Sequence, residues 1–404
     1  MASNIDNDTT RGFEKAPRPE SLDVTKCSIS IDPNSFTLET TDEVEVLESV
    51  IEQDRALRSL ELGLAIHRPN YHIYVAGASG TGKRSHVKAL LSHTAPDRSV
   101  PDDWVYVHNF EHTDAPAAVA LKAGQGNRFR RDMEALLKTL VEELPKAYHD
   151  RAHQELLQHA IYHGNAASND AFLKLRGAAR EVGFEVRTGD EGELVTLPIL
   201  GETTLEMKEL LALPDGDRRE IEGRRELLEP LFTDFVQANR EIEHRTNELI
   251  GKHNKTLSET VAKRPFARLR RRYRSGGDKL RTFLKGLHGY FIESMDSFMS
   301  DQEGMAHEAR ARDRFSPFRV KVAVDNSKTV GAPVIFETHP SFYRMFGKIE
   351  RRVEQGIYFT DHTMIQGGSL VRANGGFLVC HAADLFALSG VWENLKTTLR
   401  NREV

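Results

Sequence analysis

The sequence predicts an α/β protein in which a parallel sheet flanked by helices is interrupted by a large helical, coiled-coil-like insertion with a small β-hairpin. Three observations support this prediction. A glycine loop follows a β-rich run and precedes a helical segment, helical periodicity dominates residues 129–313, and β-rich runs return after Pro317. Alternating strands and helices are typical of parallel sheets, and a long helical stretch between two such parts indicates an insertion.

The composition limits the possible classes of protein. A chain of 404 residues with 39% hydrophobic and 28% charged residues suggests two or three domains with packed cores. Its net charge of −5 does not predict an obligate nucleic-acid partner. The two cysteines, Cys27 and Cys380, do not suggest a disulfide framework and favour a cytoplasmic protein. No apolar run approaches the roughly 20 residues of a membrane span, so we expect no membrane partner.

The N-terminal part begins with a polar segment, residues 1–22, which we expect to be disordered. Residues 43–65 have helical spacing, with apolar residues at Val46, Leu47, Val50, Ile51, Leu57, Leu60 and Leu64. The run YHIYVAG, residues 71–77, predicts a buried strand, and DWVYVHNF, residues 103–110, predicts the next one. This order of strand, loop, helix and strand is how a parallel α/β sheet begins.

The insertion is predicted from amphipathic periodicity. One helix face collects Phe129, Met133, Leu136, Leu137, Leu140 and Leu144, and another collects Leu280, Phe283, Leu284, Leu287, Phe291, Met295 and Phe298. Apolar residues recur every seven positions at Ile221, Leu228, Phe235, Ile242 and Leu249. Because Pro230 interrupts this repeat, we expect a short antiparallel helix pair. The run FEVRTGDEGELVTLPIL, residues 184–200, predicts a β-hairpin.

Three strand candidates follow Pro317, in the runs FRVKVAVDNS, APVIFETHP and GGFLVCHA. We therefore divide the chain into a tail (1–22), a first core segment (23–128), a helical insertion (129–313) and a second core segment (314–404).

The glycine loop predicts a phosphate site. Gly77, Ala78, Ser79, Gly80, Thr81, Gly82 and Lys83 fit the pattern G-x-x-x-x-G-K. Glycines allow backbone N–H groups to turn toward phosphate oxygens, and the following helix directs its positive end at the same anion. The alternative is a glycine-rich turn with an exposed lysine. Because a β-rich run precedes the loop and a helix follows it, we favour phosphate binding.

One position departs from the pattern. The residue after the lysine is usually Ser or Thr, whose hydroxyl holds Mg²⁺. Here it is Arg84, and Ser85 comes next. Either Ser85 takes the role through a shifted turn, or magnesium is held less directly.

Two blocks of the sequence resemble a known family, the Lon-like bacterial ATP-dependent proteases. The first is VIEQDRALRSLELGLAIHRPNYHIYVAGASGTGKRS, residues 50–85. The second, residues 318–386, contains Phe-Gly-x-Ile-Glu at 346–350, Thr-Asp-His-Thr at 360–363 and Arg-Ala-Asn-Gly-Gly at 372–376. The resemblance covers about residues 40–404 and implies an AAA+ P-loop core. It also implies ATP and Mg²⁺ as cofactors, a hexameric ring, unfolded protein substrates and a serine protease domain with a Ser–Lys dyad.

Several positions depart from the family pattern, and these departures predict that ATP hydrolysis is impaired. At the end of the Walker B strand, where the family has an aspartate for Mg²⁺, stands His381. The neighbouring glutamate position is Ala382, and the nearest carboxylate is Asp384. His339 replaces the family's asparagine before Pro340. Because the family's protease segment follows the point where this sequence stops, we assign no catalytic residue and expect no peptidase activity from these 404 residues.

Three further features of the sequence each have a functional and a structural interpretation. The segment Lys263–Arg281 carries nine cationic residues against one acid and indicates either a DNA-binding patch or a solvated helix end. His159 and His163 partly share a helix face and His153 lies six residues before the first of them, but no carboxylate is placed as in H-E-x-x-H, so we expect no metal site and take surface or partly buried histidines as the default. Phe346 and Gly347 resemble a pore loop that grips polypeptide, and a core position for Phe346 is the alternative.

The sequence therefore favours an ATP-binding AAA+ module of a Lon-like protease, with hydrolysis impaired. The alternative is a degenerate relative that assembles with partners or binds nucleic acid without catalysis.

Overall fold

The computed structural model describes residues 21, 23–27, 30–44, 53–66, 68, 71–189, 192–201, 203–299, 314–354 and 356–403. Apart from Ser21, the predicted tail lies outside these residues, as does the first part of the predicted helix at 43–65, residues 45–52. Two compact units are present: the described part of Met1–His67 with Ile73–Ala89, and Arg68–His72 with Leu90–Val404. Among the described residues, no helix combines the length and apolarity needed to cross a membrane.

The first unit consists of helices and an extended segment. Its elements are η1 (Val24–Lys26), η2 (Pro33–Ser35), η3 (Thr41–Glu43), α1 (Asp54–Ala65) and the start of α2 (Lys83–Thr94). The buried strand predicted at 71–77 is wrong, because these residues form no ladder and Tyr74 is 74% exposed. A β-rich run becomes a strand only when a neighbour pairs with it, and none of the described residues does.

One of the two three-stranded sheets of the second unit lies next to the main core and is antiparallel. Its strands β1 (Asp103–Val107), β2 (Ala117–Leu121) and β6 (Lys321–Val324) run in the order β2-β1-β6. The parallel pairing predicted for β1 is wrong. The connection at 108–116 is short and folds β2 directly back onto β1, so the two strands pair antiparallel. Within the described residues, parallel pairing joins only β7 (Val334–Glu337) to β12 (Phe377–Cys380).

A core of apolar side chains joins this sheet to four helices. These helices are α3 (Gly126–Tyr148), α8 (Gly277–Glu293), α9 (Met295–Met299) and the C-terminal end of α7 (Leu228–Arg272). The apolar faces predicted for α3 and α8 are confirmed, because their residues lie in or against this core. The buried Asp103 carboxylate accepts the backbone N–H groups of Gly126 and Asn326, both at 2.7 Å, and so ties β1 to the start of α3 and to the loop after β6.

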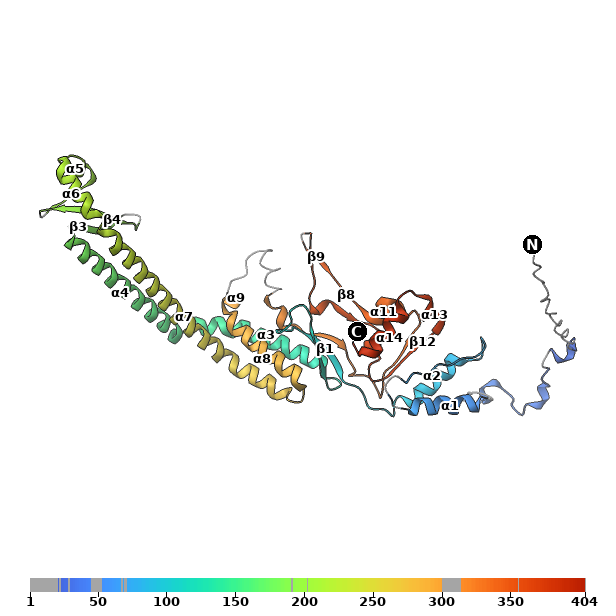
Figure 1. Cartoon of the computed structure of the whole chain (residues 1–404). Coiled ribbons are helices and arrows are strands. Elements are labelled where there is room, and N and C mark those ends of the chain that lie inside the picture. Colours follow the sequence, from blue (N-terminus) through green and yellow to red (C-terminus); the bar gives the residue numbers. More distant parts are fainter. Residues whose placement is uncertain are drawn as a thin grey trace, which may run out of the picture. The chain divides into compact units, whose positions relative to one another are not determined.

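Helices α4 (Arg151–Glu181) and α7 run side by side and carry a small β-module at their far end (Figure 1). The module contains β3 (Phe184–Thr188), β4 (Leu194–Leu200), β5 (Thr203–Thr204), α5 (Met207–Leu211) and α6 (Asp215–Arg225). The predicted hairpin is confirmed by the β3–β4 ladder. The predicted antiparallel helix pair is confirmed by the packing of α4 against α7, but its short length is wrong, since α7 has 45 residues. Pro230 lies in the first turn of α7, where its missing N–H breaks no helical hydrogen bond.

The C-terminal region is built from short elements around β7 and β12. They are η4 (Ser316–Phe318), α11 (Phe342–Phe346), β8 (Gly347–Ile349), β9 (Arg352–Glu354), β10 (Ile357–Phe359), η5 (His362–Met364), β11 (Ile365–Gly367), α12 (Ser369–Arg372), α13 (Ala382–Ala387) and α14 (Val391–Asn401). All three strands predicted after Pro317 are confirmed as β6, β7 and β12. A small core around Met345, Leu385 and Val391 holds α11, α13 and α14 together.

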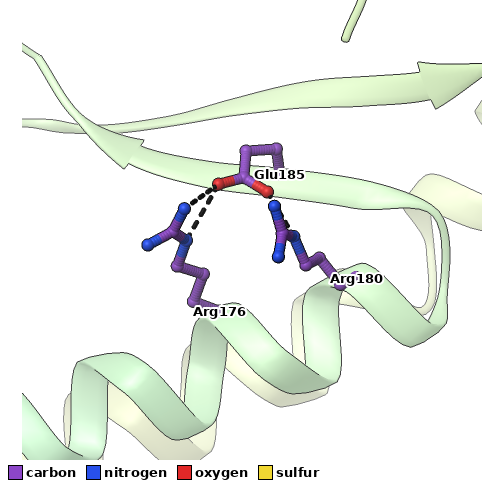
Figure 2. A network of polar contacts seen from close by, with 3 residues as sticks. All are labelled: Arg176, Arg180 and Glu185. Carbon is purple, nitrogen blue, oxygen red and sulfur yellow. Dashed lines mark hydrogen bonds and ion pairs between the residues drawn. The ribbon is translucent and has the colours of Figure 1, made fainter. Parts of the chain in front are cut away.

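A buried carboxylate fixes the β-module to α4. Figure 2 shows Glu185 of β3 between two arginines of α4, with Arg176 Nε at 2.8 Å and Arg180 Nε at 2.6 Å from its oxygens. Burial raises the pKa of Glu185, but the hydrogen bonds and charges of Arg176 and Arg180 outweigh burial and lower it below its ordinary value. Because the pKa is lowered, the pairing stabilises the module above the ordinary pKa of the carboxyl and is lost as pH falls toward the lowered value.

We expect Glu185→Gln to loosen this attachment. The neutral amide keeps the shape but loses two charge-assisted contacts, and because both arginines can rehydrate, the cost is about 1 to 3 kcal/mol. Hydrogen exchange of the β3 and β4 amides measures the effect locally. Glu181→Gln, at the exposed end of α4, is the matched control. Unchanged protection of these amides in Glu185→Gln would contradict the role given to the ion pairs.

Candidate functional site

The glycine loop has a backbone conformation that requires glycine at two positions. Gly80 and Gly82 have φ values of +81° and +70°, in the left-handed region that side chains strongly disfavour. The Thr81 hydroxyl donates to the carbonyl of Ala78 at 2.9 Å and braces the turn between them. The loop is therefore a defined turn that exposes its backbone, in a form suited to close approach by a ligand.

Lys83 is folded over this turn. Its Nζ donates to the carbonyl oxygens of Gly77, at 2.8 Å, and Ala78, at 2.6 Å. A Cβ on Gly77 would meet Cδ of Lys83 at 3.5 Å, an ordinary van der Waals contact, so the lysine side chain lies directly against residue 77. The ammonium group thus lies within the loop, held by carbonyl dipoles that an anionic ligand could replace.

The first turn of α2 completes the arrangement. The first helical hydrogen bond of α2 runs from the N–H of His86 to the carbonyl of Gly82, at 3.0 Å. Helical geometry leaves the preceding N–H groups of Lys83, Arg84 and Ser85 without a partner within the helix. Arg84 and Ser85 are exposed. The nine predicted site residues therefore offer backbone donors, a helix N-terminus and an ammonium group, which fits the phosphates of a nucleotide.

The strand predicted as Walker B ends at Cys380. His381 caps α13 and its Nδ1 lies 3.5 Å from Asp384 Oδ2, so the nearest carboxylate faces the histidine that replaces the expected acid. Ala382 is the first residue of α13 and offers no ligand atom. Among the described residues, no group of three or more His, Cys, Asp or Glu side chains could hold a metal ion. At the expected magnesium positions, Arg84, His381 and Ala382 offer no side-chain oxygen ligand of the kind that Mg²⁺ prefers.

A carboxylate that the sequence analysis missed lies beside this strand. Glu337 ends β7, opposite Cys380 in the parallel register, and is 5% exposed. It accepts hydrogen bonds from the Ser369 hydroxyl and from the N–H of His339, at 3.0 Å, and lies 3.6 Å from Arg344 Nε. Burial raises the pKa of Glu337, and these partners lower it below its usual value. The sequence did contain one signal for Glu337, since this acid directly follows the apolar run Val334–Phe336. Ligands often bind at the carboxyl ends of parallel strands.

Two other predicted features acquire a structural explanation. Phe346 packs against the core formed by Met345, Leu385 and Val391, in contact with the ring of Phe342 at 4.9 Å, which favours the core position over a pore loop. Burial and the nearby Glu337 charge raise the pKa of the Cys380 thiol to about 11. A thiol that stays protonated is a poor nucleophile.

Comparison with known protein families finds matches for two segments of the chain, one central and one C-terminal. Residues 330–404, which contain β7, β12 and α14, match the family described as the LonB-like AAA domain. Residues 103–136, from β1 into α3, match the Lon-like LonC helical domain. No curated protein matches the chain. Two separate segments thus match Lon-like protease models, one for its AAA domain and one for its helical domain, and this is the family that the sequence motifs resemble.

Proposed function

We propose that the chain is the ATP-binding AAA+ module of a Lon-like ATP-dependent serine protease. The observation that carries the proposal is the loop Gly77–Gly82, with Lys83 folded into it at the start of α2. The match of residues 330–404 to the LonB-like AAA domain supports a nucleotide as the ligand, because AAA domains bind nucleotides in general. Within this proposal, residues 23–128 and 314–404 form a P-loop core, and 129–313 are its insertion.

The loop residues have distinct roles in binding ATP. When the phosphates enter, Lys83 exchanges two carbonyl oxygens for the β- and γ-phosphate oxygens, and so exchanges dipoles for full negative charges. The N–H groups of Thr81, Gly82 and Lys83 surround the phosphates, and α2 adds its positive end. Bound ATP would supply a phosphoryl group for transfer to water. The loop, Lys83 and the start of α2 would bind and orient the phosphates.

The same site is proposed to bind ATP better than it hydrolyses it. Hydrolysis needs a positioned Mg²⁺ and an oriented water. Arg84 adds positive charge where a hydroxyl would hold the metal, and His381 with Ala382 removes two carboxylates. The ring assembly and the unfolded protein substrates implied by the resemblance are part of this proposal, as is the cytoplasmic location inferred from the two cysteines of the sequence.

Calorimetry with the whole chain tests the proposal. We expect ATP to bind with a similar dissociation constant in the presence of Mg²⁺ and in the presence of EDTA, because the phosphate contacts come from backbone donors and Lys83. Absence of a binding heat for ATP and ADP under both conditions, confirmed by equilibrium dialysis, would reject the chain as a nucleotide-binding module.

One surface favours the alternative function, binding of nucleic acid without catalysis. Arg264, Arg268 and Arg271 recur at intervals of four and three residues on α7 and are exposed. They lie opposite the buried residues Phe266 and Leu269. The two aromatic residues of this segment cannot stack on bases, because Phe266 is 1% and Tyr273 is 3% exposed. The stripe therefore fits phosphate contacts without base recognition.

If this stripe binds DNA, Arg264→Ala with Arg268→Ala and Arg271→Ala should weaken binding equally for all sequences. Three lost phosphate contacts would reduce the slope of log affinity against log salt concentration by about 3. Fluorescence anisotropy with a labelled duplex at several salt concentrations measures this slope. Arg240, Arg245 and Lys255, exposed elsewhere on α7, supply an alanine triple variant with the same change in charge. Equal slopes in the two variants would exclude the stripe as a DNA site.

A further inference from the structure

Two histidines on α4 bring their ring nitrogens together. His159 and His163 stand one helical turn apart, both are exposed, and their Nε2 atoms are 3.0 Å apart. Their ring centroids are 4.3 Å apart with the planes inclined by 62°, so the rings do not stack. The two imidazoles therefore bring the same ring nitrogen, Nε2, close together on the exposed side of the helix.

We propose that His159 and His163 form a chelating site for a divalent transition-metal ion. Imidazole nitrogens bind such ions at roughly 2.0–2.1 Å. With the nitrogens 3.0 Å apart, an ion bound equally to both subtends an angle of about 94°. That angle suits neighbouring positions of a tetragonal or octahedral ion, which points to Cu²⁺ or Ni²⁺. A tetrahedral site would need the nitrogens roughly 3.3–3.4 Å apart.

A shared ion explains the pair better than a hydrogen bond alone. Two exposed imidazoles in water exchange solvent hydrogen bonds for one another and gain little, about 1 kcal/mol or less, while they lose rotamer freedom. An ion that binds both nitrogens offsets that loss. Hard cations such as Mg²⁺ and Ca²⁺ prefer oxygen ligands, so the site discriminates against them.

The surroundings define what the chain supplies. Tyr162 contacts the His163 ring edge-on, with centroids 5.8 Å apart, and limits its rotation. Glu155 lies one turn before His159 but is paired with Arg151 at 2.7 Å. The described residues contain no cluster of three ligands, so water or a donor from another molecule fills the remaining positions. The site is thus a two-histidine chelate, distinct from the H-E-x-x-H pattern that the sequence analysis excluded.

His153, on the same helix, shows the contrasting arrangement. It is 6% exposed and its Nε2 lies 3.2 Å from Asn254 Oδ1, so it links α4 to α7. Because its ring is buried and its Nε2 contacts Asn254, His153 does not offer this nitrogen to a metal ion from solvent. Position on α4 alone therefore does not create the site; the spacing of four residues and the exposure of both rings do.

Calorimetric titration of the full chain with NiCl₂, after removal of any polyhistidine tag, tests the proposal. We expect a site with one Ni²⁺ per chain, and at least tenfold weaker binding at that site in His159→Ala and in His163→Ala. The control is His244→Ala, which removes an exposed histidine from α7. Both test substitutions place alanine in a helix, where it is favourable, and circular dichroism verifies that the helices persist.

A second measurement identifies the ligands. In electron paramagnetic resonance with one equivalent of Cu²⁺, we expect splitting from two imidazole nitrogens in the unmodified chain, and loss of that pattern in His163→Ala. Unchanged Ni²⁺ affinity in both single variants, or a copper spectrum that the substitution leaves unaltered, would show that the two rings are joined only by a hydrogen bond.

Discussion

Lys83→Ala is expected to weaken ATP binding by roughly a hundredfold, the effect of losing one strong charge-assisted contact worth nearly 3 kcal/mol. The ammonium group already lies in the loop, 2.6 Å from the Ala78 carbonyl, so it reaches bound phosphates by a small displacement. Alanine leaves the backbone donors and the helix N-terminus in place. Binding should therefore weaken strongly without disappearing, and ATP should lose more affinity than AMP.

Isothermal titration with ATP, ADP and AMP measures this difference. Lys88→Ala is the matched control, because Lys88 is exposed on the same helix and removes the same charge from outside the loop. Since the loop is exposed and Lys83 contacts only loop carbonyls in hydrogen bonds, the variant should keep its fold. Equal ATP affinity in Lys83→Ala and the unmodified chain would remove the main support for a phosphate site.

Local patterns predicted the elements whose stability is local. The apolar faces of α3 and α8 were correct because one face of each helix meets a continuous core, which demands the helical period. The hairpin β3–β4 followed from β-rich arms around a glycine turn, and β7 and β12 from short apolar runs. In each case the residues that define the period are also the ones that pack.

Pairing partners were less predictable. The run 71–77 has the composition of a strand, but composition does not specify a neighbour, and it stays unpaired in the described residues. For β1, its composition fitted either direction of pairing, and the short connection to β2 made it antiparallel. The length of α7 was underestimated because Pro230 was counted as an interruption. A proline in the first helical turn is compatible with helix continuation.

Site residues divide in the same way. The loop Gly77–Ser85 was found from sequence because its spacing is fixed by the backbone geometry of a contiguous turn. Glu337 was missed because its importance depends on Ser369 and Arg344, which are distant in sequence and come together only through the parallel pairing of β7 and β12. The histidine pair of α4 was not predicted as a metal site because the sequence lacks the glutamate of H-E-x-x-H, and the approach of the two ring nitrogens is visible only in the structure.

Restoring the two missing carboxylates is expected to have the second large effect. In His381→Asp with Ala382→Glu, we expect ATP turnover to rise by roughly a hundredfold or more, because even one such group contributes several kcal/mol to the transition state when its geometry is right. Both positions accept the change: the His381 side chain is 73% exposed, and Ala382 starts α13, where a negative charge is favourable.

The gain should depend on position and on magnesium. Ala383→Glu adds the same charge one residue later on an exposed site, and should leave turnover unchanged. Asp384, which now lies 3.5 Å from His381, loses a histidine partner in the double variant, so Asp384→Asn in that background separates its contribution from those of the new acids. Phosphate release is measured at saturating ATP, so that altered affinity does not appear as altered turnover. Binding of ATP itself should change little, since the loop and Lys83 are untouched.

One outcome would contradict this prediction: the unmodified chain already hydrolyses ATP rapidly with Mg²⁺, and the double variant is no faster. His381 and Ala382 would then not occupy the hydrolytic positions. Glu337, at the end of the adjacent strand, would be the next carboxylate to replace by glutamine.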